Sequence, residues 1–131
     1  VRELARVLRP GGVAIFLIPQ TAVLHELPHH YYNFTRFWIK EVMQRAGLEI
    51  LEIKPLGGVW SSMASHLVYF FFQSFRIKGL STPECKRNIW FYLLFPLMAL
   101  YALMSLPICL FLSWGDLTEE PNNHLVIVRK K

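Results

Sequence analysis

The sequence lacks the residue groups on which several common functions depend. It contains only two cysteines, Cys85 and Cys109, and no CxxC motif, which disfavours a zinc site or a disulfide framework and is typical of free thiols in a reducing compartment. Its 14 Lys and Arg residues are scattered singly or in pairs against 9 Asp and Glu residues. Because no basic cluster is interleaved with aromatic residues, nucleic-acid binding is not expected. A glycine-rich GxGxxG loop is also missing, so no phosphate or dinucleotide loop is predicted.

The length and composition limit the chain to one domain with an unusual apolar content. The chain has 131 residues, of which 53% are hydrophobic, and its mean hydropathy is +0.32, above the usual range of soluble domains. Most of the apolar excess lies in the C-terminal half. The sequence begins at Val1 inside a helical pattern, and we therefore expect it to be the C-terminal fragment of a longer protein.

The first organised stretch predicts half of an α/β unit. Apolar residues from Val1 to Leu8 recur with helical spacing, and Pro10, Gly11 and Gly12 then end the helix. Residues 13–19 form an apolar run without alternation, which is typical of a central strand covered by helices on both faces.

A second unit follows after a long connection, residues 19–34, that has no periodicity. Thr35 is placed to cap a helix whose apolar face comprises Phe37, Ile39, Val42, Met43 and Ala46, and Gly47 ends this helix. Residues 48–54 alternate partly in polarity, which favours a strand nearer the sheet edge. A helix between two strands in this order predicts that the strands are parallel.

These stretches resemble a known enzyme family. Residues 3–12 (ELARVLRPGG), 25–37 (HELPHHYYNFTRF), 44–50 (QRAGLEI) and 57–60 (GGVW) follow in order. Together they are similar to the class I S-adenosylmethionine-dependent methyltransferases, and most closely to a bacterial subgroup of the type 11 methyltransferases. His30, Asn33 and Leu48 depart from that subgroup, which commonly has Asp, Arg and Phe at these positions.

The resemblance implies a fold. It predicts the C-terminal half of a Rossmann-like α/β sheet with strands at 13–19, 48–54 and 125–129, the last inserted antiparallel between the first two. Residues 1–58 and 115–131 would form this core, and residues 59–114 a hydrophobic helical insertion. The glycine-rich loop and acidic residue that hold S-adenosylmethionine in the family have no counterpart here. The cofactor would therefore be bound mainly by a missing N-terminal half, and this fragment alone would be inactive.

Candidate site residues concentrate in the long connection, because ligands bind at the carboxyl ends of strands in α/β sheets. The catalytic candidates, as base or orienting group, are His25, His29, His30 and Tyr32. The substrate-binding candidates are His25, Glu26, His30, Tyr31, Tyr32 and Arg36. The alternative is that the aromatic residues pack and the histidines are solvated. His and carboxylate groups also suit metals, but their spacing matches no metal motif, and no metal site is predicted.

The segment Ile89–Leu112 contains no charged residue and, as one helix, would be about 36 Å long, enough to cross a bilayer core of about 30 Å. However, a single crossing would separate the last strand from its sheet. Pro96 and Pro107 favour a kinked or broken helix. Three alternatives therefore remain: a transmembrane span, a helix lying at the membrane interface, or a helix buried on the domain or in a homodimer. Some contact with a membrane is favoured.

The sequence therefore predicts a methyltransferase that uses S-adenosylmethionine and a small-molecule or lipid-like acceptor such as a lipid, quinone or glycan. We expect it to be cytoplasmic and peripheral at the inner face of the membrane, with a single transmembrane span as the alternative. The rival hypothesis is a non-catalytic membrane-anchoring module on a methyltransferase-like scaffold.

Overall fold

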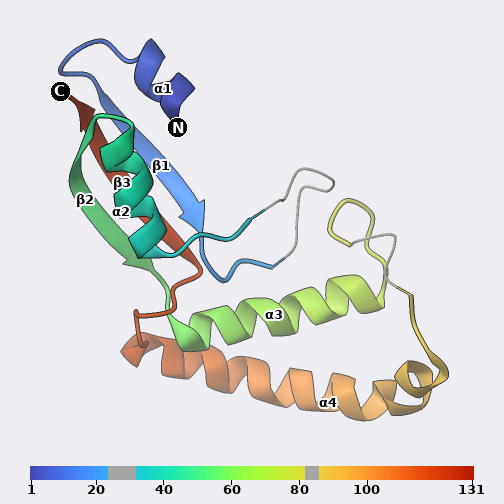
Figure 1. Cartoon of the computed structure of the whole chain (residues 1–131). Helices are drawn as coiled ribbons and strands as arrows, with labels where there is room; N and C mark the ends of the chain where they lie inside the picture. The colour runs from blue at the N-terminus through green and yellow to red at the C-terminus, as the bar shows by residue number, and fades with distance from the viewer. Residues whose placement is uncertain (24–31, 82–85) are drawn as a thin grey trace.

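The computed structural model describes residues 1–23, 32–81 and 86–131 (Figure 1). The fold is mixed α/β. Its elements are α1 (Arg2–Val7), β1 (Val13–Pro19), α2 (Arg36–Arg45), β2 (Leu48–Leu56), α3 (Val59–Ser74), α4 (Ile89–Leu112), the short 3-10 helix η1 (Ser113–Gly115) and β3 (Asn123–Lys130). The three strands lie close to the predicted ranges, although β2 and β3 each extend further.

The sheet has the strand order β1-β3-β2, and both of its pairings are antiparallel. The last strand therefore lies between the two earlier ones, as predicted. Because β1 and β2 both run opposite to β3, they are parallel to each other but are not hydrogen-bonded neighbours. Pro19 of β1 and Leu56 of β2 both pair with Asn123, so the carboxyl ends of β1 and β2 lie at the same end of the sheet.

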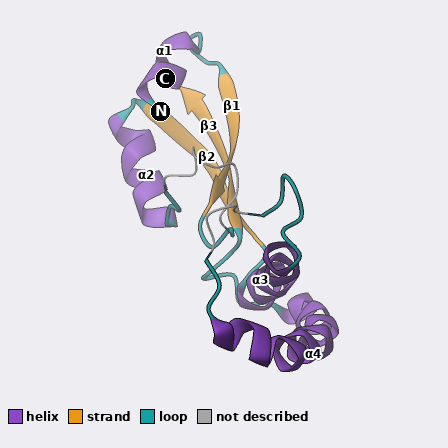
Figure 2. Cartoon of the chain, turned by 90° about the vertical axis from the view of Figure 1, so that its right-hand side faces the viewer, coloured by secondary structure: helices purple, strands orange, loops and turns teal. Residues whose placement is uncertain are grey.

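One face of the sheet forms the core. Its central strand contributes Val126 and Val128, which are fully buried against Ile39 and Met43 of α2, and Ala5 of α1 joins the same cluster. Both helices lie on this side of the sheet (Figure 2). The face of α1 predicted from periodicity is only partly buried, because Leu4 and Val7 are exposed and Ala5 alone is fully covered.

The opposite face of the sheet is exposed along β1, contrary to prediction. Val13, Ile15 and Leu17 alternate along this strand and are 53%, 66% and 61% exposed. The prediction of a central strand covered on both faces is therefore wrong for the described chain: β1 is an edge strand, and no described helix covers this side (Figure 2). The strand is apolar on both faces, but only one face is buried.

Helix α2 begins and ends where the sequence predicted. The Thr35 hydroxyl accepts a hydrogen bond from the Trp38 N–H at 3.4 Å, and Gly47 takes a φ of +73°, which a glycine adopts without steric cost. The predicted apolar face is wrong at one position. Phe37 is exposed, because the buried side of the helix is defined by Ile39 and Met43.

Helices α3 and α4 run side by side in opposite directions beyond the end of the sheet (Figure 1). Few side chains of the two helices are fully buried, and these include the small residues Ala64 of α3 and Ala102 and Cys109 of α4. Further from the sheet, the rings of Phe70 and Phe95 lie 6.2 Å apart. The two helices form a hairpin, which we call the α3–α4 hairpin.

Helix α4 is continuous from Ile89 to Leu112 and contains both Pro96 and Pro107. Of the predicted kinked or broken helix, the broken alternative is therefore wrong. Its first turn is capped by Asn88, whose side chain accepts from the Phe91 N–H at 3.0 Å.

The stretch Ile89–Gly115 is long and apolar enough to cross a membrane, and its most apolar part has a mean hydropathy of 2.1. Only 11% of that part is buried inside the structure. The described chain therefore does not enclose this helix. This contradicts the alternative in which α4 is buried on the domain, whereas spanning, interfacial and dimer-forming arrangements stay open.

Candidate functional site

Most of the site residues predicted from sequence, namely His25, Glu26, His29, His30 and Tyr31, lie outside the described residues. Tyr32 is described and is 70% exposed, with its ring 5.7 Å from that of Phe34. Arg36 is also exposed, and its guanidinium lies 5.1 Å from the centre of the Phe37 ring. Neither Tyr32 nor Arg36 lines the main pocket described below.

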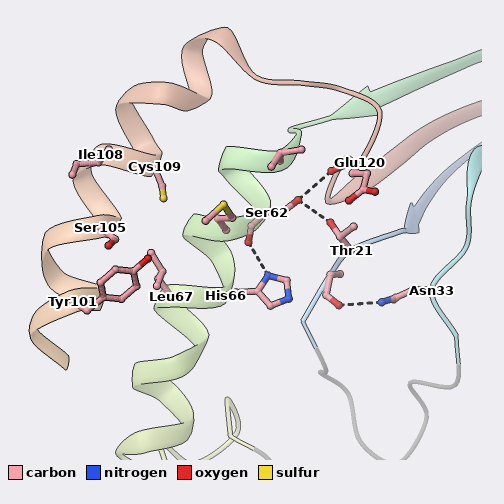
Figure 3. A pocket seen from close by; sticks show the side chains of 13 residues that line it. Thr21, Asn33, Ser62, His66, Leu67, Tyr101, Ser105, Ile108, Cys109 and Glu120 are labelled. Atoms are coloured by element: carbon pink, nitrogen blue, oxygen red, sulfur yellow. Dashed lines mark hydrogen bonds between the residues drawn. The ribbon is translucent and has the colours of Figure 1, made fainter. Parts of the chain in front are cut away.

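The two described ends of the long connection meet at the carboxyl end of β1. The Phe34 N–H donates to the Pro19 carbonyl at 2.7 Å, and the Asn33 side-chain amide donates to the Ala22 carbonyl at 3.2 Å. Thr21, Ala22 and Asn33 are thereby held together where β1 ends, at the side that faces α3 (Figure 3).

A pocket of about 600 Å³ lies between this end of β1 and the α3–α4 hairpin. Its walls are mainly apolar, and the side chains that form them include Val59, Met63, Leu67, Ile108 and Cys109. Polar side chains are distributed around it, namely Thr21, Asn33, Ser62, His66, Tyr101, Ser105 and Glu120 (Figure 3). A concave, mainly apolar pocket with a few polar groups is the usual form of a small-molecule site.

A hydrogen-bond network joins α3 to the segment that leads into β3. The hydroxyl oxygens of Thr21 and Ser62 are 2.8 Å apart. Thr21 donates to the Pro121 carbonyl at 3.0 Å, and Ser62 donates to the Glu120 carbonyl at 3.3 Å. Because three separate chain segments share these bonds, the polar end of the pocket is built as one unit.

His66 is held in a defined orientation at the pocket. Its Nδ1 lies 2.7 Å from the Ser62 carbonyl oxygen. A carbonyl oxygen only accepts hydrogen bonds, so Nδ1 must carry the proton. His66 is an exposed residue. In the neutral ring Nε2 then has a lone pair that no residue in the described parts of the chain bonds, so His66 can accept a hydrogen bond from a ligand in the pocket.

A second histidine lies deeper, at the start of β3. His124 is only 2% exposed, and its Nε2 lies 2.7 Å from the Gln20 side-chain oxygen. Its Nδ1 is buried without a partner among the described residues. Burial is the main cause that lowers the pKa of His124, and the positive charge of Arg36 lowers it further. These causes favour the neutral ring, which suits a structural role at the end of the sheet.

The described residues do not fit S-adenosylmethionine. Two pairs of adjacent glycines lie beside a strand. Gly57 and Gly58 follow β2, and the Gly58 N–H donates to the Ser61 hydroxyl at 2.6 Å. Gly11 and Gly12 precede β1, and their amides are occupied as well: Gly11 N–H donates to the Lys130 carbonyl and Gly12 N–H to the Arg9 carbonyl. These glycines therefore close a turn against β3. No cluster of three metal-binding side chains occurs within residues 1–23, 32–81 and 86–131, but this leaves out His25, Glu26, His29 and His30.

The comparisons with known proteins found no matching family model, curated protein or solved structure.

The sequence analysis missed the pocket because it treated residues 59–112 as an apolar insertion. One signal could have revealed it. Ser62 and His66 stand four residues apart within a helix that is otherwise mostly apolar, so both lie on one face. The partners Thr21 and Glu120 could not have been found this way, because they come from distant segments that meet only in the fold.

Proposed function

We propose that this chain is the acceptor-binding part of an S-adenosylmethionine-dependent methyltransferase that acts on a lipid-like molecule at a membrane. The observation that carries this proposal is the strand order β1-β3-β2 with an antiparallel central strand. That order is what the resemblance of residues 3–60 to the type 11 methyltransferases implies for the end of a Rossmann-like sheet.

The exposed side of the sheet also supports this proposal. Val13, Ile15 and Leu17 leave an apolar face open on an edge strand, and contiguous apolar surface is usually covered by another part of a protein. In a Rossmann-like domain both faces of the sheet carry helices and further strands extend beyond β1. The open face and edge are where such parts would dock.

The cofactor belongs outside the described site. Since Gly11 and Gly12 close a turn, we assign no residue of this chain to S-adenosylmethionine and derive no chemical step through it. What this chain supplies in the proposal is the pocket at the carboxyl end of β1, the position where α/β proteins bind ligands. In methyl transfer, holding the acceptor in a fixed orientation provides much of the rate enhancement.

The α3–α4 hairpin is proposed to bring this pocket to the inner face of the membrane. Leu93, Leu97, Met104 and Phe111 are examples of the apolar side chains that α4 leaves exposed. Both ends of the hairpin lie beside the sheet, so a hairpin that lies on the membrane or dips into it returns the chain to the same side. This removes the separation of β3 from its sheet that a single crossing would cause.

Charge at the far end of the hairpin favours a location at the membrane surface. Arg76, Lys78, Lys86 and Arg87 lie between α3 and α4, and the first three of these side chains are exposed. Basic residues near a membrane bind the anionic lipids of the cytoplasmic leaflet, whereas burying four of them in hydrocarbon would be costly.

A non-catalytic membrane-anchoring module is the second candidate. The length and apolar character of α4, which the described chain leaves largely uncovered, favour it. The test is to incubate the complete gene product with S-adenosylmethionine carrying a radiolabelled methyl group and a total lipid extract. Label that appears in the lipid fraction supports the methyltransferase. Absence of transfer by a gene product that still binds membranes favours the anchoring module.

A further inference from the structure

We propose that the pocket between β1 and the α3–α4 hairpin binds a single-chain amphiphile with a neutral hydroxyl head, such as a long-chain phenol or alcohol. The hydroxyl would donate a hydrogen bond to His66 Nε2 while the chain lies between α3 and α4. This inference rests on the proposed function only in taking the ligand as the methyl acceptor.

The apolar walls define the chain-binding part. Met63 and Leu67 of α3 face the pocket from one side, and Ile108 and Cys109 of α4 from the other. Figure 3 shows the Cys109 and Leu67 side chains directed toward the space between the helices. A volume of about 600 Å³ is within the range for small-molecule pockets. Apolar side chains on two parallel walls suit an extended chain better than a compact polar ligand.

The polar end defines the head group. The hydroxyls of Thr21 and Ser62 already donate to main-chain carbonyls, so neither has a proton left to donate to a ligand. His66 differs, because Nδ1 is bonded to the Ser62 carbonyl while Nε2 has no partner among the residues described. A group that donates a hydrogen bond complements this nitrogen, and an alcohol or phenol does so without carrying charge.

Charge around the pocket excludes an anionic head. Glu120 lines the pocket, and of the pocket-lining residues described none is Lys or Arg. Glu119 neighbours Glu120 along the chain. A fatty-acid carboxylate or a phosphate placed beside Glu120 would meet a like charge without a compensating cation, which disfavours its binding. The pocket is therefore expected to prefer a neutral hydroxyl over an anionic head.

The experiment is photolabelling of the full chain in lipid nanodiscs with a 4-alkylphenol that carries a diazirine in its alkyl chain. Peptide mapping by mass spectrometry then locates the label. We expect it on Met63, Leu67 or Ile108, and we expect excess 4-octylphenol to suppress it. The matched anionic competitor 4-octylbenzoate should be at least roughly tenfold weaker. Stronger competition by 4-octylbenzoate, or by the cationic 4-octylbenzylamine, which could pair with Glu120, overturns the proposed head group.

Two variants test the pocket itself. His66→Leu should reduce competition by 4-octylphenol roughly tenfold, as expected for loss of one hydrogen bond to the ligand, and Ser105→Phe should block labelling by filling the pocket. His66→Gln keeps a side-chain acceptor and should restore part of the preference. Tyr92→Leu removes a polar group on an exposed part of α4 that does not line the pocket, and should change nothing.

Two outcomes contradict the inference. Label spread over the exposed side chains Leu97, Leu103 and Phe111 without suppression would show partition into lipid only, and unchanged labelling in His66→Leu and Ser105→Phe would exclude this pocket. Circular dichroism and thermal midpoints establish that each variant is folded. Because the assay needs no cofactor, a failure here leaves the methyltransferase proposal standing, and a lack of methyl transfer leaves this binding result standing.

Discussion

The Ser61 hydroxyl donates a hydrogen bond to Asp116 Oδ2 at 2.6 Å, although the two residues are 55 positions apart. The Asp116 carboxylate also accepts from the backbone N–H groups of Trp60 at 2.8 Å and Ser61 at 3.0 Å. The first turn of α3 is therefore capped by a residue that follows α4 and η1. This contact closes the α3–α4 hairpin at the sheet and so fixes the wall of the pocket that carries Ser62 and His66.

Removing this cap should destabilise the hairpin. Burial raises the pKa of Asp116, but hydrogen bonds from the Ser61 hydroxyl and from the N–H groups of Ser61, Trp60 and Leu117 together outweigh it, so the pKa is lowered. The carboxylate is thus stabilised in the folded state. We expect Asp116→Ala to lower the free energy of unfolding by about 1 kcal/mol, the typical value of a lost helix cap, in urea denaturation followed by circular dichroism.

Glu119→Ala serves as the control for this variant, because Glu119 is an exposed acidic residue three positions away whose side chain caps no helix in the described structure. Equal losses in the two variants would show that Asp116 does not act through the cap.

The same junction predicts a strong effect of a methyl group at Gly58. A Cβ built there would lie 2.2 Å from the Leu117 carbonyl oxygen and 2.7 Å from the Asp116 carboxyl carbon, so Gly58→Ala forces the two segments apart. Steric overpacking of this kind costs about 1–3 kcal/mol. At Gly115 a Cβ would meet no atom within 4 Å, so Gly115→Ala is the matched control. Thermal unfolding of both variants measures the loss of stability. Equal unfolding midpoints would contradict the close approach of Gly58 to Asp116 and Leu117.

His124 should make stability depend on pH. Its pKa is lowered by burial and by Arg36, so the folded state binds its proton less readily than the unfolded state, whose histidine pKa is about 6.5. The contribution is fully present above that value and is lost as the pH falls below it toward the folded-state pKa. We expect the free energy of unfolding to decrease between about pH 7 and pH 5.

The variant His124→Gln should flatten this part of the pH profile, and Arg36→Gln should flatten it partly, since Arg36 is the smaller cause. If wild type and His124→Gln have parallel profiles, His124 is not the group responsible.

Membrane binding should depend on the basic residues between α3 and α4. Replacing Arg76, Lys78 and Lys86 by Gln removes three positive charges, each worth about 1 kcal/mol at an anionic surface. Sedimentation with vesicles of phosphatidylcholine and phosphatidylglycerol should show about a hundredfold weaker binding, with little change for phosphatidylcholine alone. A control variant replaces the exposed residues Arg9, Lys40 and Lys131 by Gln, which alters the net charge equally. If both triple variants lost vesicle binding equally, the basic residues between α3 and α4 would not form the specific membrane-binding surface.

The sequence was sufficient to predict β1 and α2, because both carry local signals. The apolar run predicted the strand β1, and the caps at Thr35 and Gly47 predicted the ends of the helix α2. The position of β3 came from the resemblance. Burial could not be predicted in the same way: Phe37 and Ile15 are apolar but exposed, since burial depends on which elements lie opposite. The continuity of α4 through Pro96 and Pro107, both of which are exposed, could not be predicted either, because local propensity favours a kink or break at proline.

The predicted site in the histidine-rich connection stays a prediction, because most of its residues lie outside the described structure. The pocket in the described structure is a different site, which uses Thr21, Ser62, His66 and Glu120. These residues come from β1's end, α3 and the segment before β3. Only the hydrogen bonds among them bring these positions together, and no local pattern in the sequence records those bonds.

The most direct test of the central claim is calorimetric titration of S-adenosylmethionine into the complete gene product and, separately, into the 131-residue chain. The account predicts binding with a dissociation constant on the order of micromolar, about −8 kcal/mol, for the complete gene product, and none for the chain described here, whose glycines close a turn. If the complete, folded gene product binds no S-adenosylmethionine, the methyltransferase proposal is contradicted, and the membrane-anchoring function remains.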